Sequence, residues 1–136
     1  NSTYIIDVNS GIIKYKYNFS TLTKPIINKD YIFLISRNNY LISINIKSGK
    51  ILYSYNINEQ VAKFLNSKTK ELELKKLFLL NNELMILLQN SYILNFKING
   101  NLEKIDKIPS KIQTFPVIAN GSFIFLDKNN KISIIN

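Results

Sequence analysis

The sequence predicts an all-β fold, a β-propeller fragment of about three four-stranded blades with one short helical insertion. A unit of strands and turns recurs along the chain, its glycine turns spaced by 38 and 51 residues. The segments between turns are rich in β-branched and aromatic residues, which is typical of strands. Repeats of about 40–50 residues built only of strands and turns are typical of propeller blades.

The repeat can be followed through its turns and its prolines. Similar glycine turns end at Gly11, Gly49 and Gly100, and proline-led strands begin near Pro25 and Pro116. These copies divide the chain into the end of one blade (1–19), a second blade (23–57), an insertion (58–74), a third blade (75–108) and the start of a fourth (113–136). Because the chain begins at Asn1, with neither Met nor a signal peptide, we expect a piece of a longer protein.

Strands are expected wherever apolar runs lie between turn residues. The predicted ranges are 2–8, 12–19, 24–28, 31–36, 40–46, 50–57, 76–80, 84–89, 92–98, 102–108, 113–119, 122–127 and 131–135, with a turn at residues 109–110. Strands 31–36 and 84–88 are almost wholly apolar. On the flank of an incomplete ring they would be exposed and would promote self-association.

The insertion contains the one predicted helix. Asn58 is expected to cap it, and Val61, Phe64 and Leu65 share one face at spacings i, i+3 and i+4. These three residues are a candidate partner-binding surface, since insertions in repeat proteins tend to carry the binding face. Alternatively, the helix folds this apolar face onto a blade edge. Residues 68–74 alternate in polarity and are expected to re-enter the sheet as a strand.

The charge of +9 comes from lysines, 17 of the 18 basic residues, with Arg37 the exception. Specific nucleic-acid readout favours arginine, and these lysines are scattered along strands and turns, so no specific nucleic-acid partner is expected. Abundant Ile, Asn and Lys indicate an AT-rich genome as the source of the charge. No apolar run of 18 or more residues predicts a transmembrane segment.

The residue inventory argues against catalysis. The chain has no His and no Cys, and none of its serines lies in a Gly-x-Ser-x-Gly turn. We therefore predict no catalytic, cofactor-binding or metal-ligating residues, no cofactor and no enzymatic activity. Tyr15, Tyr17 and Phe19 alternate on one strand face, where packing against the next blade is the expected role.

Residues 25–53 run from a proline-led strand through Tyr40-Leu-Ile-Ser-Ile-Asn45 to Lys47-Ser-Gly-Lys-Ile-Leu-Tyr53. This pattern resembles the repeat of pyrroloquinoline-quinone (PQQ)-type propellers, whose last strand ends in Thr-Gly-Lys-x-Leu-Trp. Tyr53 stands in the place of the tryptophan, and the chain has no tryptophan at all. The quinone and calcium sites of the enzymes in this family map onto no residue here.

The non-enzymatic BamB-type branch of this family is the more similar one. The resemblance implies a protein-binding scaffold in the outer-membrane β-barrel assembly machinery, located in the periplasm at the outer membrane of a Gram-negative cell. Its partner would be the central barrel protein of that machinery. The alternative is a segment of a PQQ-dependent quinoprotein dehydrogenase whose cofactor site lies outside this chain.

Overall fold

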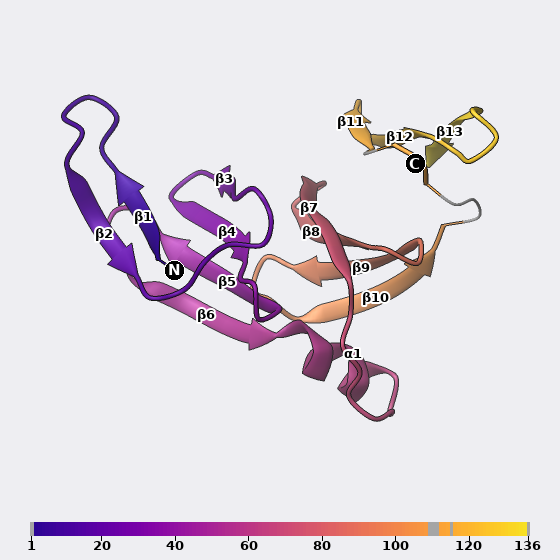
Figure 1. Cartoon of the computed structure of the whole chain (residues 1–136), viewed down its shortest axis with the longest axis horizontal. Helices are drawn as coiled ribbons and strands as arrows, with labels where there is room; N and C mark the ends of the chain where they lie inside the picture. Colours follow the sequence, from indigo (N-terminus) through magenta and orange to yellow (C-terminus); the bar gives the residue numbers. More distant parts are fainter. Residues whose placement is uncertain (1, 109–111, 115, 136) are drawn as a thin grey trace. The chain divides into compact units, whose positions relative to one another are not determined.

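The computed structural model describes residues 2–108, 112–114 and 116–135, and antiparallel sheets make up most of this part (Figure 1). The predicted turn at 109–110, and residues 1, 115 and 136 of the predicted first and fourth blades, lie outside the described residues. The chain forms two compact units, Asn1–Leu72 and Glu73–Asn136. The predicted all-β class with one short helix is confirmed.

The first unit contains a two-stranded sheet, a four-stranded sheet and the helix. Each sheet is a meander in which strands adjacent in sequence pair antiparallel. Its elements are β1 (Thr3–Ile6), β2 (Ile13–Tyr17), β3 (Ile26–Asn28), β4 (Tyr31–Ile35), β5 (Tyr40–Asn45), β6 (Ile51–Asn56) and α1 (Ile57–Phe64).

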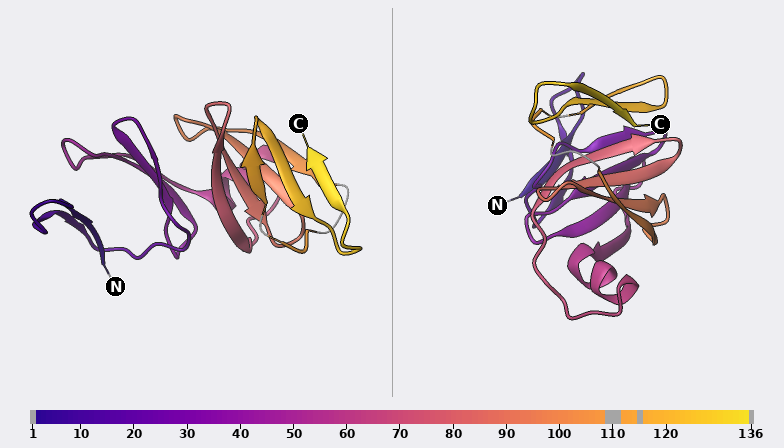
Figure 2. Two further views of the ribbon diagram at one scale, coloured as in Figure 1. Left: turned by 90° about the horizontal axis from the view of Figure 1, so that it is seen from above. Right: turned by 90° about the vertical axis from the view of Figure 1, so that its right-hand side faces the viewer.

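The second unit repeats the four-stranded meander and adds a three-stranded one. Its strands are the pinkish-red, orange and yellow arrows of Figure 2. Its strands are β7 (Leu74–Leu80), β8 (Glu83–Leu88), β9 (Tyr92–Lys97), β10 (Leu102–Lys107), β11 (Val117–Ala119), β12 (Ser122–Leu126) and β13 (Ile132–Ile135). Each of these strands overlaps a predicted range; β7 begins two residues and β8 one residue before its predicted start, and the others are shorter than predicted.

The turns are built by short polar side chains. In the β1–β2 turn, Asp7 Oδ1 accepts hydrogen bonds from the backbone N–H groups of Asn9 and Ser10, at 3.1 and 3.0 Å. Asn45 Oδ1 accepts the same two bonds in the β5–β6 turn, from Lys47 and Ser48, both at 3.0 Å. Each turn ends in a glycine with positive φ, so the sequence repeat is a repeat of one backbone geometry.

The third turn differs from the prediction, which treated it as the same turn. Gly100 N–H donates to the carbonyl of Lys97, three residues back. In the first two turns Gly11 and Gly49 donate to Asp7 and Asn45, four residues back. The β9–β10 turn is therefore one residue shorter, and no side chain at its first position can accept in the manner of Asp7.

Asp7 makes the first unit sensitive to acid. Its hydrogen bond with Lys14 and the N–H groups of the turn hold the pKa of the carboxyl well below its ordinary value of 3.8. The unfolded chain protonates near 3.8, so this stabilisation is present above that pH and is lost as the pH falls toward the lowered pKa.

Asp7→Asn is expected to keep the turn, because Asn45 performs the same role in the next one. The variant should be slightly less stable than the parent at pH 7, because it loses the ion pair with Lys14, and should lose less stability than the parent between pH 4 and pH 2. Urea unfolding across that pH range measures the difference. Parallel pH profiles for the two proteins would contradict the assignment.

Two tyrosines of β2 hold the β5–β6 turn. The Tyr15 hydroxyl donates to the carbonyl of Lys47 at 2.6 Å, and the Tyr17 hydroxyl donates to the carbonyl of Gly49 at 2.8 Å. Burial raises the pKa of Tyr17, which keeps its hydroxyl a donor. Gly49 lies directly beneath the Tyr15 ring, where a Cβ atom would be 2.3 Å from the nearest ring carbon. The alternating aromatics thus pack on the neighbouring sheet, as predicted.

Each unit has its own apolar core. In the first unit one face of β4 and β5 packs against side chains of the β1–β2 sheet and of the link that follows β2. The core residues are Ile32, Leu34, Ile42 and Ile44, with Ile5, Tyr17, Phe19 and Ile46 packed against them. In the second unit, Phe123 and Phe125 of β12 pack on Phe78, Leu87, Ile93 and Ile108.

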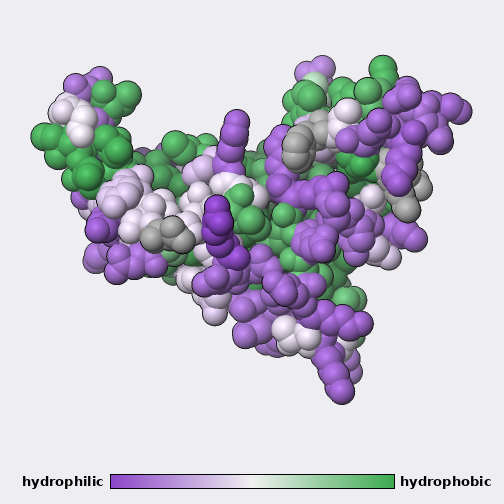
Figure 3. Space-filling view, in the orientation of Figure 1, coloured by the Kyte–Doolittle hydropathy of each residue, from purple (hydrophilic) through white to green (hydrophobic). Residues whose placement is uncertain are grey.

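The prediction that strands 31–36 and 84–88 form the exposed, adhesive flanks is wrong. Residues 32–36 are buried, and so are residue 84 and residues 86–88. The terminal sheets and the β1–β2 turn carry exposed apolar side chains: Tyr4, Ile6, Val8, Ile12 and Ile13 in the first unit, and Val117, Ile132 and Ile134 in the second. Ile27, Ile51 and Leu52 of the β3–β6 sheet are exposed as well. Figure 3 shows hydrophobic residues gathered over the β1–β2 turn.

Self-association is therefore expected to involve the terminal sheets. Within the described residues the outer edge of β13 pairs with no strand, and Ile132 and Ile134 beside it are 70% and 61% exposed. The double variant Ile132→Lys with Ile134→Lys should shift the chain toward monomer in sedimentation velocity. Asn101→Lys with Gln113→Lys adds the same charge without removing apolar area and should leave the oligomer distribution unchanged. Equal effects of the two pairs would show that charge alone controls association.

Candidate functional site

The helical insertion is anchored at its base by one asparagine. Asn39, buried in the β4–β5 turn with φ 60°, donates from Nδ2 to the carbonyl of Leu72 at 3.0 Å and to Asn58 Oδ1 at 3.4 Å. Its own carbonyl accepts from the N–H of Ile57 at 2.8 Å. Asn58 Oδ1 also accepts from the N–H of Leu72 at 3.2 Å, which closes the loop. Both ends of the insertion are thus tied to the same turn.

The helix begins two residues earlier than predicted. The N-cap is Asn56, whose Oδ1 accepts from the N–H of Glu59 at 3.3 Å, and not Asn58. Both asparagines are good caps by residue type. Asn58 serves the loop closure instead, because the β6 strand ends at Asn56 and the helix starts at the next residue. The helix therefore begins one residue before the predicted insertion.

The helix ends in a Schellman motif. The N–H of Ser67 donates to the carbonyl of Ala62 and the N–H of Asn66 to that of Lys63, with Asn66 at φ 48°. This arrangement stops the helix at Phe64 and leaves Phe64 and the C-cap Leu65 48% and 56% exposed.

The structure separates the three predicted partner-binding residues by depth. Val61 is only 8% exposed and, with Ile57 and Ala62, forms the buried face of the helix. Phe64 and Leu65 remain accessible at the tip. Each of the two interpretations of the helix therefore applies to one part of it. The apolar face is buried up to Ala62, whereas the apolar side chains at the C-terminal end are exposed.

Residues 65–73 connect the helix to the second unit without forming a strand, which corrects the prediction that 68–74 re-enters the sheet. Strand β7 begins only at Leu74. Residues 63–71 are all exposed and include three lysines: Lys63, Lys68 and Lys70. In Figure 3 this region, below α1 in Figure 1, is covered mainly by hydrophilic residues. Its two large apolar side chains, Phe64 and Leu65, are therefore surrounded by polar and basic ones.

A cavity of about 240 Å³ lies on the same turn. It is lined by the link that follows β2 and by the β4–β5 turn: Asn18, Phe19, Ser20, Ser36, Arg37 and Asn38. The N–H of Arg37 donates to the carbonyl of Ser20 at 3.0 Å and the N–H of Leu22 to that of Ile35 at 2.7 Å, which hold the link against the turn. Because Asn39 follows Asn38 directly, the cavity and the base of the insertion both contact the β4–β5 turn. We call residues 18–20, 36–39 and 57–72 the loop edge.

The sequence did not point to Arg37 or Asn39 as parts of a site. The one sequence signal for Arg37 is that it is the sole arginine of the chain, whose other 17 basic residues are lysines. Asn39 carries a turn signal, but its contacts with Asn58 and Leu72 depend on the fold. Within the described residues, no group of three or more His, Cys, Asp or Glu side chains could hold a metal ion. No helix there is long and apolar enough to cross a membrane.

No family model matches the chain, and no curated protein matches it. Solved structures do match. One is BamB from Moraxella catarrhalis, with a TM-score of 0.53 and 9% identity over 98% of this chain and 51% of that one. Another is the computationally designed Ika8 protein, with a TM-score of 0.66 and 12% identity over 98% of this chain and 39% of that one. The WD40 domain of SCAP from fission yeast also matches, with a TM-score of 0.60, 14% identity, and coverage of 98% and 34%.

The structure and these likenesses define the class: the chain folds as a fragment of a β-propeller. At such identities the likeness shows the fold alone. The chain spans between about a third and a half of the length of these three structures.

Proposed function

We propose that this chain is part of a non-catalytic scaffold that binds a protein partner through the loop edge. The observation that supports this most directly is the exposure of Phe64 and Leu65 on a loop tied down at its base by Asn39. A fixed base lowers the entropy lost on binding, and exposed aromatic and aliphatic side chains are the usual anchors of protein interfaces. Loops of this kind on a rigid sheet scaffold commonly carry binding function.

We further propose that the scaffold has a BamB-like role in outer-membrane β-barrel assembly, in the periplasm at the outer membrane. The resemblance of residues 25–53 to a PQQ-type repeat supports this proposal, and the propeller fold of BamB is consistent with it. The partner would be the central barrel protein of the assembly machinery.

Site-specific photo-crosslinking in the intact protein, in its own cells, tests both levels of the proposal. A crosslinking residue at Phe64 should capture a single major protein, identified by mass spectrometry as the barrel assembly protein. The control position is Val8, which is also apolar and is 93% exposed, in the β1–β2 turn. A different single partner at Phe64 would reject the BamB-like role and retain the scaffold. Equal, diffuse crosslinking at both positions would reject the scaffold.

The same resemblance also supports a second candidate, a segment of a PQQ-dependent quinoprotein dehydrogenase whose cofactor site lies outside this chain. Under that hypothesis the intact protein should oxidise alcohols or sugars when PQQ and calcium are added, whereas a scaffold should not. Turnover by the purified intact protein would favour the enzyme over the scaffold.

A further inference from the structure

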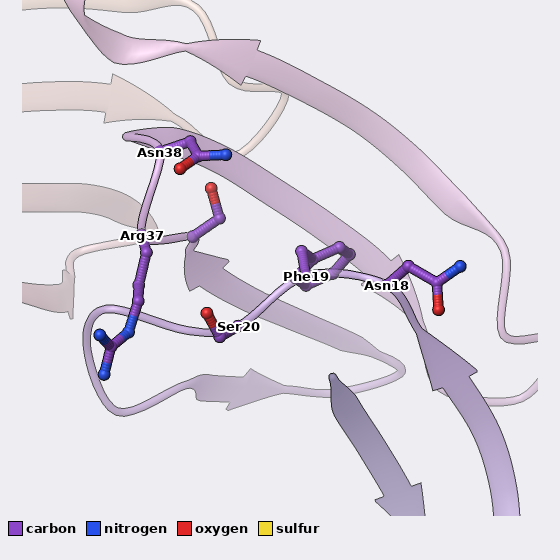
Figure 4. Close-up of a pocket in the computed structure, with 6 residues that line it drawn as sticks. Asn18, Phe19, Ser20, Arg37 and Asn38 are labelled. Atoms are coloured by element: carbon purple, nitrogen blue, oxygen red, sulfur yellow. The ribbon is translucent and has the colours of Figure 1, made fainter. Parts of the chain in front are cut away.

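The cavity on the loop edge has a lining made almost entirely of hydrogen-bond donors. Figure 4 shows Ser20 and Phe19 in the middle, with the Arg37 side chain to one side of them and Asn18 to the other. Among the described residues, Phe19 supplies the one apolar side chain of the lining, and no carboxylate contributes to it.

Most of these side chains have no protein partner among the described residues. Among the described residues, the side chains of Asn18, Ser20, Arg37 and Asn38 have no hydrogen-bond or ion-pair partner. Ser36 is the exception, since its Oγ accepts from the N–H of Tyr40 at 3.2 Å. The guanidinium of Arg37 is therefore available to a ligand, with amide and hydroxyl groups in the same lining.

A carboxylate fits this chemistry best. Guanidinium presents two parallel N–H groups that match the two oxygens of a carboxylate, and such charge-assisted bonds are stronger than neutral ones. Asparagine and serine side chains elsewhere in the lining can also donate hydrogen bonds to carboxylate oxygens. The chain's charge of +9 attracts acidic groups over a longer range.

We propose that this cavity binds a carboxylate carried by an acidic segment of the protein partner, on the same loop edge as the apolar contact made by Phe64 and Leu65. The proposal rests on the proposed function and names the chemistry of the partner. The cavity supplies charge recognition and the helix tip supplies apolar contact, so a partner segment with both acidic and apolar side chains would engage the whole loop edge. Because the cavity is open to solvent, each carboxylate alone should bind weakly.

The single arginine permits a direct test by nuclear magnetic resonance. The chain has one arginine Nε–Hε signal, which reports on Arg37 without ambiguity. Titration with acetyl-tetraglutamate amide should shift this signal and the side-chain amide signals of Asn18 and Asn38 along one saturable curve. Arg37→Lys keeps the charge but loses the two parallel donors, so the affinity read from the asparagine signals should fall at least about fivefold. Lys128→Gln removes one charge between β12 and β13, outside the loop edge, and should change the affinity by less than about twofold.

The other outcomes would overturn the proposal. Saturable shifts with inorganic phosphate and none with the peptide would show an anion site of different chemistry. Unsaturable shifts spread over all lysine-rich surfaces, equal in parent and Arg37→Lys, would show nonspecific attraction. If Arg37 does not respond while Phe64 still crosslinks to one partner, the carboxylate site fails and the scaffold stands. If Arg37 binds the peptide and Phe64 captures no partner, the scaffold fails, and with it the assignment of the carboxylate to a partner.

Discussion

Gly49→Ala is expected to destabilise the first unit by about 2–4 kcal/mol, and Gly11→Ala by only about 1–2 kcal/mol. Both glycines have positive φ, 68° and 71°, so both replacements carry the backbone cost of a side chain in that region. They differ in surroundings. A Cβ at position 49 would lie 2.3 Å from the Tyr15 ring, whereas nothing lies within 4 Å of one at position 11.

The pair separates the effect of packing from that of backbone conformation. Urea unfolding followed by circular dichroism and tyrosine fluorescence measures both variants. Equal losses would show that the Tyr15 ring swings aside at no cost and that the contact of β2 with the β5–β6 turn contributes little. In a double-mutant cycle, Tyr15→Ala should remove most of the excess cost of Gly49→Ala, because the clashing ring is gone.

Phe123→Ala is expected to destabilise the second unit by about 3–5 kcal/mol. Phe123 is 1% exposed, and its ring meets that of Phe78 edge-on with centroids 4.7 Å apart. The replacement leaves a cavity between β12 and the β7–β10 sheet, and removes an aromatic pair that adds about 0.5–1.5 kcal/mol beyond buried area.

Phe64→Ala is the matched control, because it removes the same atoms from a side chain that is 48% exposed. Its cost should be below about 1.5 kcal/mol, since much of the side chain is already in water. Hydrogen exchange of the β12 amides measures the first variant, and that of the α1 amides the second. A small effect at Phe123 would contradict the packing of β12 on the preceding sheet. A large effect at Phe64 would contradict its position at an accessible helix tip.

The strand order could be predicted because each strand is bounded by residues with a local conformational preference. Six of the eight non-glycine residues with positive φ in the described part are asparagines, and four glycines share that conformation. Asparagine and glycine tolerate this region better than other residues, so turn positions are visible in the sequence. The exact ends of the strands cannot be read from the sequence, because the polar groups that end a strand have several possible hydrogen-bond partners nearby.

The candidate site was predictable only in part, and Val61, Phe64 and Leu65 show why. Helical spacing places three side chains on one face but does not say how deeply the sheet covers that face. The Schellman motif at Asn66 ends the helix between the buried and the exposed members of the set. The cap shows the same limit, since Asn56 and Asn58 are equivalent by type and only the end of β6 decides between them.

The sequence by itself determined the repeat, the strand order and the lack of histidine and cysteine, because these depend on composition and on neighbours along the chain. Only the tertiary structure decided which apolar strands are covered, how the insertion is anchored by Asn39, and that Arg37 faces a cavity with residues 18–20. These features join positions far apart in the sequence through hydrogen bonds between one sheet and its connections, such as the bond from Asn39 to Leu72, 33 residues apart. Burial and cavities depend on such nonlocal contacts, which a local sequence pattern does not predict.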